Sequence, residues 1–222
     1  MTVAAALVGC VPAGEDLRFA GPQPTNDVAL TFDDGPSSWT PAILGELERE
    51  RAVATFFVVG SLIAHNAGIL RRMLRDGDAL GNHSYSHPVL AGDGPYAHEQ
   101  ISETNALIWQ ASGYRPCLFR APYGATSPEL IADARSQGLL TTEWNVDPRD
   151  WSQPGVEAIV STTLRQTQPG SIILLHDGGG VRAQTVEALP RIIRAIRERS
   201  LRLVTVPELL RLRPRYAGAK QA

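Results

Sequence analysis

Two carboxylates stand side by side in the segment Thr-Phe-Asp-Asp-Gly at residues 31–35. Asp33 and Asp34 come directly after the apolar run 28–32, and a glycine and a proline then turn the chain. Adjacent carboxylates can exchange protons with a substrate or bind a metal ion. They can equally form an Asx turn that caps a helix starting near residue 40. The segment alone leaves both interpretations open.

Two histidines, His83 and His87, are four residues apart in the segment His-Ser-Tyr-Ser-His. Imidazoles at this spacing lie on one face of a helical turn or of an extended segment, and they suit a single metal ion. The same spacing also occurs without a metal. With a carboxylate from another strand end, however, the pair would complete a set of two histidines and one carboxylate. Such a set leaves coordination positions open for water and substrate.

Three further segments place polar residues where an apolar run ends. Arg120 opens the segment Arg-Ala-Pro-Tyr-Gly, where a structural salt bridge is as good an interpretation as a catalytic role. Asp147 and Asp150 precede a tryptophan in a stretch too polar for a core. His176 ends an apolar run and is followed by an aspartate and a run of glycines. Glycines at such a place predict that the backbone approaches another group closely.

Short apolar runs, each bounded by glycine, proline or aspartate, predict parallel strands that are buried on both faces. They alternate with segments of helical pattern. We expect strands at residues 28–32, 54–59, 78–82, 118–120, 139–144, 171–175 and 201–206, and helices at 40–51, 61–76, 97–112, 128–137, 155–167 and 183–199. This alternation predicts a βα-repeat fold, either barrel-like or doubly wound. The polar residues then fall at the carboxyl ends of strands, the edge where such folds build active sites.

The composition agrees with one soluble globular domain. The chain has 222 residues, of which 43% are hydrophobic and 20% charged, with a formal net charge of −2. This balance excludes disorder, and the lack of excess positive charge argues against a nucleic-acid partner. Lys220 is the only lysine, and its place near the C-terminus excludes Schiff-base and P-loop chemistry. After the first residues, no apolar run approaches the roughly 20 residues of a spanning helix.

The two ends of the chain are expected to flank the folded unit, with residues 1–26 a leader or linker and 213–222 a frayed tail. Cys10 ends the run Ala-Ala-Ala-Leu-Val-Gly-Cys, which resembles the lipobox of bacterial lipoproteins, where the cysteine is lipidated. Residues 1–9 contain no lysine or arginine, so this run would be either the end of an incomplete export signal or a stretch of small residues without a targeting role. Cys117 is expected to be a free packing residue, since two cysteines make no disulfide framework.

Taken in order, the five polar segments resemble the five motifs of the NodB-type polysaccharide deacetylases, family four of the carbohydrate esterases. In this chain the motifs read TFDDG, HSYSH, RAPYG, DPRDW and LLHD. The resemblance covers about residues 27–210 and implies a distorted (β/α)7 barrel that forms a single catalytic domain at 27–212. It implies an enzyme that removes acetyl groups from polymers of N-acetylglucosamine, such as chitin or peptidoglycan.

The resemblance also implies roles for the residues of the first three motifs. Asp33 would be the catalytic base, and Arg120 would orient it. Asp34, His83 and His87 would bind a divalent metal ion, which in this family is usually zinc. Co²⁺ or another divalent ion would be an alternative. A metal ion with three protein ligands activates water and polarises a carbonyl group, which the hydrolysis of an acetamide requires.

The remaining motif residues would supply the acid and the pocket. Asp150 would pair with His176, the catalytic acid, while Trp151 and Leu174 would line a pocket for the acetyl methyl group. The backbone N–H of Tyr123 would complete the oxyanion site. An unperturbed histidine pKa of about 6.5 suits protonation of an amine leaving group near neutral pH.

Three other functions stay open. The same site would serve an esterase that removes O-acetyl groups from xylan, and the motifs do not separate the two activities. A non-haem iron oxygenase also uses two histidines and a carboxylate, but the βα pattern and the unused His176 speak against it. A silent carbohydrate-binding relative would have lost an acid or a base, and here every motif residue is present. We expect a monomer that binds a polysaccharide and is exported or anchored at the cell surface.

Overall fold

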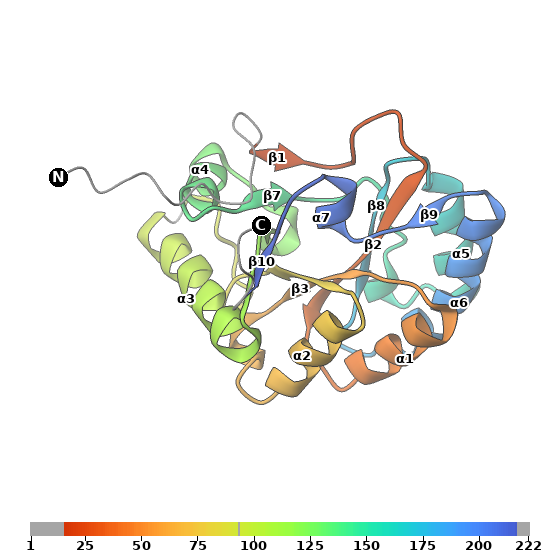
Figure 1. Cartoon of the computed structure of the whole chain (residues 1–222), viewed down its shortest axis with the longest axis horizontal. Helices are drawn as coiled ribbons and strands as arrows, with labels where there is room; N and C mark the ends of the chain where they lie inside the picture. The colour runs from red at the N-terminus through yellow and green to blue at the C-terminus, as the bar shows by residue number, and fades with distance from the viewer. Residues whose placement is uncertain (1–15, 93, 217–222) are drawn as a thin grey trace.

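A sheet of eight strands, paired in parallel, forms the centre of the molecule (Figure 1). The computed structural model describes residues 16–92 and 94–216. The strand order is β1-β7-β6-β4-β3-β2-β8, and β9 pairs with β2 beside this path. The strands are β1 (Leu17–Arg18), β2 (Asp27–Gly35), β3 (Thr55–Val58), β4 (Ala79–Asn82), β6 (Leu118–Phe119), β7 (Leu140–Thr142), β8 (Ile172–His176) and β9 (Arg202–Leu203). Every strand predicted from an apolar run is present, which confirms the βα-repeat fold.

The two edges of the sheet are joined by the chain that follows β7. Val146 forms an isolated parallel bridge with Ile173 of β8. The N–H of Leu174 donates to the carbonyl oxygen of Val146 over 2.9 Å. This contact brings the chain that follows β7 against β8, the strand at the opposite edge of the sheet. The fold is therefore a distorted βα barrel rather than an open, doubly wound sheet.

Side chains of β2 alternate between two apolar clusters. Leu30 and Phe32 belong to the cluster that includes the buried side chains of the helices, whereas Ala29 belongs to a second cluster with residues from β3, β6, β7 and β8. Thr31 and Asp33 share the face of Ala29, because successive side chains of a strand point to opposite faces. The strand therefore carries a carboxylate on its inner face to its carboxyl end.

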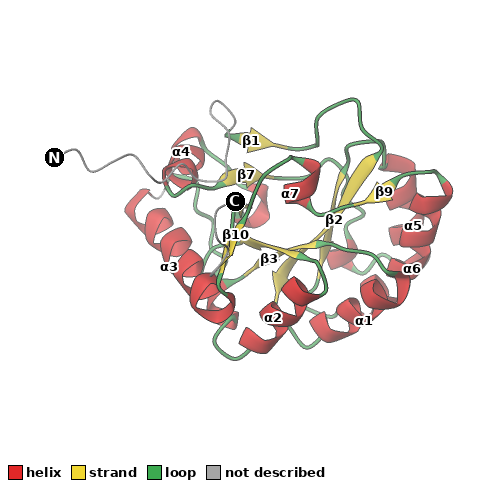
Figure 2. Ribbon diagram, in the orientation of Figure 1, coloured by secondary structure: helices red, strands yellow, loops and turns green. Residues whose placement is uncertain are grey.

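Helices cover the outside of this sheet (Figure 2). They are α1 (Thr40–Glu50), α2 (Ala67–Arg75), α3 (Gly94–Ser112), α4 (Pro128–Ser136), α5 (Val156–Gln166), α6 (Ala183–Glu198) and the short α7 (Val206–Leu209). Helix α4 begins as predicted, since the Ser127 side chain accepts the N–H of Leu130 and Pro128 occupies the first turn. In the described part of the chain, no helix is long and apolar enough to cross a membrane.

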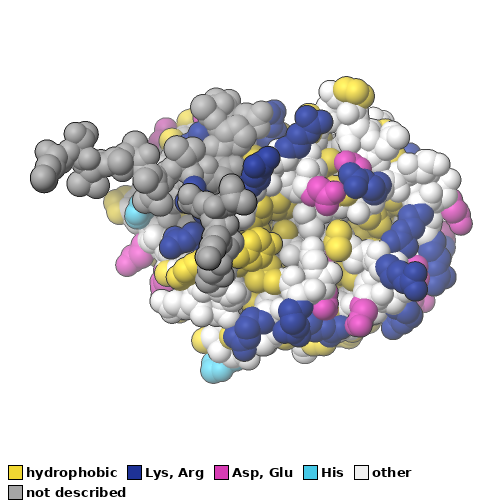
Figure 3. Space-filling view, viewed as in Figure 1, with side chains coloured by type: hydrophobic (Ala, Val, Ile, Leu, Met, Phe, Trp, Pro, Cys, Tyr) yellow, Lys and Arg dark blue, Asp and Glu magenta, His cyan; other side chains and the backbone are white. Residues whose placement is uncertain are grey.

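The arginines of α6 lie on its exposed face, as the helical spacing predicts. They also connect α6 to the end of α1, because Arg194 forms an ion pair with Glu50 and Arg197 donates to the main-chain oxygens of Glu50 and Arg51. Basic and acidic side chains are interspersed over the face of the molecule drawn in Figure 3. These surface pairs join neighbouring helices and leave the chemistry to the strand ends.

Four predictions about the chain outside the main elements differ from the structure. Part of the expected leader is strand β1, which pairs with β7, and part of the expected tail is β10 (Arg215–Tyr216), which pairs antiparallel with β5 (Tyr114–Arg115). The helix expected at 61–76 begins only at Ala67, after a separate 3₁₀ turn. Two-residue strands and single turns carry too few side chains to produce a periodic pattern.

The fourth difference concerns the cysteines. Cys117 is fully buried, as a packing residue should be, but it is disulfide-bonded, so the prediction of a free thiol is wrong. The spacing of two cysteines says nothing about their distance in space, which is why the sequence could not reveal the bond. Cys10 and its predicted lipidation lie outside the described residues.

Candidate functional site

A buried ion pair between Asp33 and Arg120 lies at the carboxyl end of β2. Nη1 of Arg120 donates to Oδ1 of Asp33 over 2.7 Å, and both side chains are almost completely buried. Arg120 also donates to the main-chain oxygens of Thr142 and Glu143, and its guanidinium lies 3.9 Å from the centre of the Phe57 ring. Because the guanidinium is held on several sides, it fixes Oδ1 of Asp33 in place.

The side chains of Asp34, His83 and His87 come together beside this ion pair, and their ligand atoms lie within 4.8 Å of one another. Oδ1 of Asp34 is 3.1 Å from Nε2 of His87 and 3.5 Å from Nε2 of His83. Oδ2 of Asp33 lies 3.6 Å from the same His83 nitrogen. The free oxygen of Asp33 therefore adjoins the cluster of three.

The three side chains fit a divalent cation. Nδ1 of His83 lies 2.9 Å from the carbonyl oxygen of Arg120, which can only accept, so Nδ1 carries a proton and Nε2 of the neutral ring offers its lone pair to the cluster. Oδ1 of Asp34 is buried and has no hydrogen-bond partner in the structure. Two nitrogen ligands and one oxygen ligand with open positions are typical of catalytic zinc sites.

Electrostatics at the cluster favour positive charge. Burial raises the pKa of the Asp34 carboxyl, but the imidazoles of His83 and His87 beside it outweigh burial and bring the pKa far below its usual range. Burial lowers the pKa of His83, yet the charge of Asp33 and the hydrogen bond to Asp34 raise it above its ordinary value. The carboxylates therefore draw either protons or a cation into the space between the rings.

The loop that carries the two histidines is held by Gln100 of α3. Oε1 of Gln100 accepts the backbone N–H groups of Tyr85 and Ser86 over 3.1 and 2.9 Å. Oδ1 of Asn82 accepts the N–H of Ser84 over 2.8 Å. Sequence reasoning missed Gln100 and Asn82, because their partners are main-chain atoms and no residue pattern marks them.

A second buried pair joins His176 at the end of β8 to Asp150. Nδ1 of His176 lies 2.7 Å from Oδ1 of Asp150, and the backbone N–H of His176 donates to Oδ2 over 3.0 Å. Burial lowers the pKa of His176, but the hydrogen bond and charge of Asp150 raise it above its ordinary value. His176 is also the register partner of Asp33 between β8 and β2. One member of each pair therefore stands on one of two neighbouring strands, Asp33 on β2 and His176 on β8.

As the sequence predicts, the glycines after His176 lie close to another group. That group is Asp34, one of the three candidate metal ligands. A Cβ on Gly178 would lie 1.9 Å from the carbonyl oxygen of Asp34, and one on Gly179 would lie 2.4 Å from Oδ2 of Asp34. Similarly, a Cβ on Gly35 would meet the carboxylate of Asp177 at 2.0 Å. The loop after β8 packs its bare backbone against the loop after β2.

One cavity of about 440 Å³ is bordered by Asp33, by the cluster of Asp34, His83 and His87, and by His176. Among the residues predicted to contact substrate, Tyr123, Trp151 and Leu174 line it, and the ring of Tyr123 contacts that of His87 edge-on at 4.6 Å. Tyr123 and Trp151 are 69% and 46% exposed, so both are available at the rim. The cavity lining also includes side chains that the motifs did not single out as substrate contacts: Ala121, Trp144, Asp147, Gly179 and Arg182.

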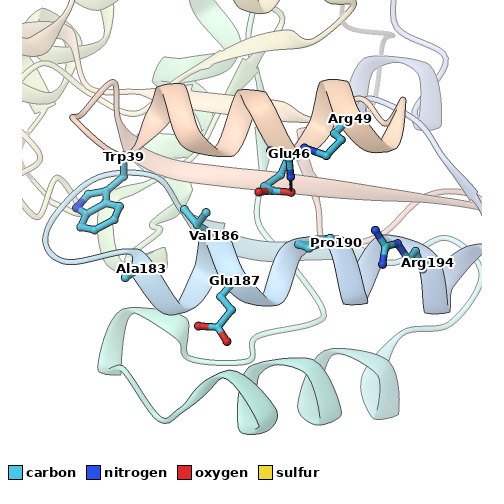
Figure 4. A pocket seen from close by; sticks show the side chains of 8 residues that line it. All are labelled: Trp39, Glu46, Arg49, Ala183, Val186, Glu187, Pro190 and Arg194. Carbon is cyan, nitrogen blue, oxygen red and sulfur yellow. Dashed lines mark hydrogen bonds and ion pairs between the residues drawn. The ribbon is translucent and has the colours of Figure 1, made fainter.

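A second groove lies between α1 and α6 and does not contain these residues (Figure 4). Trp39 stands at one end of it, and Pro190 forms part of its wall. Its arginines are already paired, Arg49 with Glu46 and Arg194 with Glu50. Among the described residues, the group of histidines and carboxylates that could hold a metal ion lies at the strand ends and not in this groove.

A cluster of three candidate cation ligands lies beside a carboxylate and a carboxylate-bound histidine at the carboxyl edge of a βα barrel. This arrangement is typical of metal-assisted hydrolases. Comparison with known proteins narrows this class. The family model described as polysaccharide deacetylase matches residues 20–142. A chitooligosaccharide deacetylase from Bradyrhizobium sp. (strain ANU 289) is 38% identical over 199 residues, which cover 83% of this chain and 91% of the relative. The chain belongs to the polysaccharide deacetylase family.

Solved structures agree with this assignment. A peptidoglycan N-acetylglucosamine deacetylase in complex with 4-naphthalen-1-yl-N-oxidanyl-benzamide superimposes with a TM-score of 0.86 at 33% identity, covering 91% of this chain and 98% of that one. A family-four pseudoenzyme from Bacillus anthracis has a TM-score of 0.81 at 27% identity and covers 87% of this chain and 68% of its own. The same fold thus occurs in a deacetylase and in a pseudoenzyme, so the side chains of the site determine whether a protein of this fold is active.

Proposed function

We propose that this enzyme removes acetyl groups from the N-acetylglucosamine units of a polysaccharide, chitin-type or peptidoglycan, with a divalent metal ion. One observation carries the proposal. A carboxylate fixed by arginine and a histidine bound to a carboxylate border the same cavity as a three-ligand cluster. Amide hydrolysis needs all three: a base for water, a positive centre for the carbonyl oxygen and an acid for the amine.

The metal would be held by Asp34, His83 and His87. When bound, a divalent ion lowers the pKa of a coordinated water and polarises the substrate carbonyl. Zinc fits two imidazole nitrogens and one carboxylate oxygen with open positions, and Co²⁺ accepts the same ligands. The proton on Nδ1 of His83 is fixed by the carbonyl oxygen of Arg120, so the imidazole is oriented before any metal arrives.

Asp33 is the proposed base. Its Oδ1 is occupied by Arg120 at 2.7 Å, while Oδ2 lies at the edge of the metal cluster, 3.6 Å from Nε2 of His83. A water molecule in the cavity can therefore lose its proton to Oδ2 without any movement of the carboxylate. Arg120 acts as a positioning residue, because it contacts Asp33 and lies beneath the cavity.

His176 is the proposed acid. Asp150 accepts the Nδ1 proton, so the opposite nitrogen, Nε2, is the one that can give a proton to the departing amine. The hydrogen bond and charge of Asp150 raise the pKa of His176, which favours the protonated imidazole. Trp151 and Leu174 would receive the acetyl methyl group, and the backbone N–H of Tyr123 would stabilise the oxyanion.

Two alternatives differ in measurable ways. An O-acetyl esterase acting on xylan would use the same groups, but an alcohol leaving group depends less on the proton from His176 than an amine does. A silent carbohydrate-binding protein would bind the polymer and release no acetate. The complete set of acid, base and ligand residues favours an active enzyme.

We also propose that the protein works outside the cytoplasm. The disulfide at Cys117 supports this location, because disulfides persist in oxidising compartments. Lipidation of Cys10 and a bridge from Cys117 to Cys10 exclude each other, since both use the same sulfur. The mass of the intact mature protein, before and after reduction, distinguishes a lipid-modified cysteine from a bridged one.

Acetate release from chitooligosaccharides, peptidoglycan and acetylxylan tests the function directly. The protein is stripped with a chelator and reconstituted with Zn²⁺ or Co²⁺, and the His83→Ala variant serves as the control that should not regain activity. We expect acetate from an N-acetylglucosamine polymer only after reconstitution. Full activity in the metal-free protein, or release from acetylxylan alone, would overturn the proposal.

A further inference from the structure

The hydrogen bonds around Asp150 extend beyond His176 to the first turn of α6. Oγ1 of Thr185 donates to Oδ2 of Asp150 over 2.7 Å, and Thr185 is 1% exposed. The carboxylate is thus held at both oxygens: Oδ1 faces Nδ1 of His176, and Oδ2 accepts from Thr185 and from the backbone N–H of His176. Without Thr185, Oδ2 would keep only the longer hydrogen bond from the backbone N–H of His176, and the carboxylate would be held less firmly.

Arg182, the residue just before α6, holds the main chain of the loop that follows His176 and of the loop that contains Asp150. Nε of Arg182 donates to the carbonyl oxygen of Gly178 over 2.7 Å, and Nη1 reaches the carbonyl oxygen of Trp151 at 3.4 Å. Arg182 is 3% exposed. The loop that follows His176 and the loop that contains Asp150 are therefore tied to a single helix start.

We infer that Thr185 is a positioning residue for the catalytic acid, which it serves by fixing the Asp150 carboxylate in the orientation that binds Nδ1 of His176. This inference rests on the proposed function for the role of His176. The hydroxyl has no place in the metal cluster and does not line the cavity. Its loss should therefore affect proton donation to the leaving group and leave metal binding intact.

The matched pair of variants is Thr185→Val, which keeps the shape and removes the hydroxyl, and Thr185→Ser, which keeps the hydroxyl. Thr163→Val is the control, because Thr163 is also a fully buried helix threonine, and its hydroxyl donates only to the main-chain oxygen of Ile159. We expect Thr185→Val to lower kcat/KM on a chitooligosaccharide by about tenfold, the effect of one hydrogen bond to a charged group. Thr185→Ser should restore most of the activity.

A substrate with a different leaving group distinguishes the loss of positioning by Thr185 from a general disturbance of the active site. Hydrolysis of 4-nitrophenyl acetate needs no proton on the departing phenolate, so Thr185→Val should change that rate by less than about twofold. In an Asp150→Asn background the Thr185→Val substitution should cause no further loss, because both act through one residue. Equal losses on both substrates, or additive losses in the double variant, would overturn the inference.

A readout independent of turnover completes the test. The Nδ1 proton of His176 should exchange with water faster in Thr185→Val than in the wild type and in Thr163→Val, as seen by NMR. An unchanged exchange rate contradicts the inference. If the wild-type protein releases no acetate, the proposed function fails, and the exchange rate alone decides whether Thr185 orders the pair.

Discussion

The Nδ1–H of His83 donates to the main-chain carbonyl oxygen of Arg120 over 2.9 Å, while the side chain of the same arginine binds Asp33 at 2.7 Å. One residue therefore fixes both the tautomer of a metal-ligand candidate and the orientation of the proposed base. These two groups cannot shift independently, because a movement of Arg120 displaces both. Fixed spacing of this kind is what a site needs when a base must face a metal-bound water.

Mutations of the adjacent carboxylates Asp33 and Asp34 should have different effects, the first on catalysis and the second on metal binding. Asp33→Asn keeps the size of the side chain but cannot take a proton, so we expect on the order of a 10²-fold or greater loss of kcat with normal zinc content. Asp34→Asn should instead lose zinc. Metal analysis after dialysis, together with kinetics, tests both, and loss of zinc from Asp33→Asn would show that the two roles have been exchanged.

Replacing Gly179 by alanine should weaken metal binding. A Cβ there would lie 2.4 Å from Oδ2 of Asp34, and the residue has a φ of +70°. Gly92→Ala is the matched control, since Gly92 has a φ of +86° and no atom within 4 Å of the added Cβ. Both variants carry a strain of about 1–2 kcal/mol from the left-handed conformation.

Only Gly179→Ala should also displace Asp34. We expect its zinc dissociation constant to rise by about tenfold or more, while that of Gly92→Ala stays at the wild-type value. Titration calorimetry of the stripped proteins measures both constants. Equal zinc affinity in the two variants would mean that Asp34 is not held by the glycine loop.

Asp150→Asn should move the alkaline limb of the pH profile. In the wild type the hydrogen bond and charge of Asp150 raise the pKa of His176, so the acid stays protonated to higher pH. Without the carboxylate this pKa falls, and kcat/KM should decline at lower pH, because the imidazole loses its proton earlier. Glu157→Gln, an exposed carboxylate on α5, should leave the limb in place. An alkaline limb unmoved by Asp150→Asn argues against His176 as the acid.

Asp78 should make the fold less stable as pH rises. Burial raises the pKa of its carboxyl to about 7, and one of its oxygens has no hydrogen-bond partner. The folded state therefore keeps a proton that the unfolded chain loses near pH 4, so the free energy of unfolding decreases between about pH 4 and pH 7. Asp78→Asn should remove this slope and be more stable by on the order of 2 kcal/mol at pH 8. Urea denaturation at several pH values measures it, with the exposed Asp16→Asn as control.

The strands, and the polar residues that the structure brings together at their ends, could be predicted because they leave local signals. Apolar runs mark β2 and β8, and the polar residues at their ends stand out against them. The glycines after His176 even predicted a close approach, although only the structure shows that Asp34 is the group approached. Local sequence indicates which residues need a special environment, and the fold determines the partner that provides it.

The supporting residues could not be predicted, because their roles depend on distant partners. Gln100 binds backbone N–H groups of another loop, and Thr185 binds a carboxylate from a different segment. Neither belongs to a motif or breaks a periodic pattern. Strand β1 could not be predicted either, because its pairing with β7 relies on the main-chain atoms of only two residues.

The bridge between Val146 and Ile173 joins the edges of the barrel, and its strength sets where the barrel should open first. This seam rests on isolated bridges and a few hydrogen bonds, whereas β2 is paired with β3 and β8 along several residues. Local opening should therefore start at the seam, and the amide of Leu174 should exchange with solvent before those of β3. Asp150 lies just beyond Val146 in the chain, so we expect local opening beside the proposed acid and not beside the candidate metal ligands.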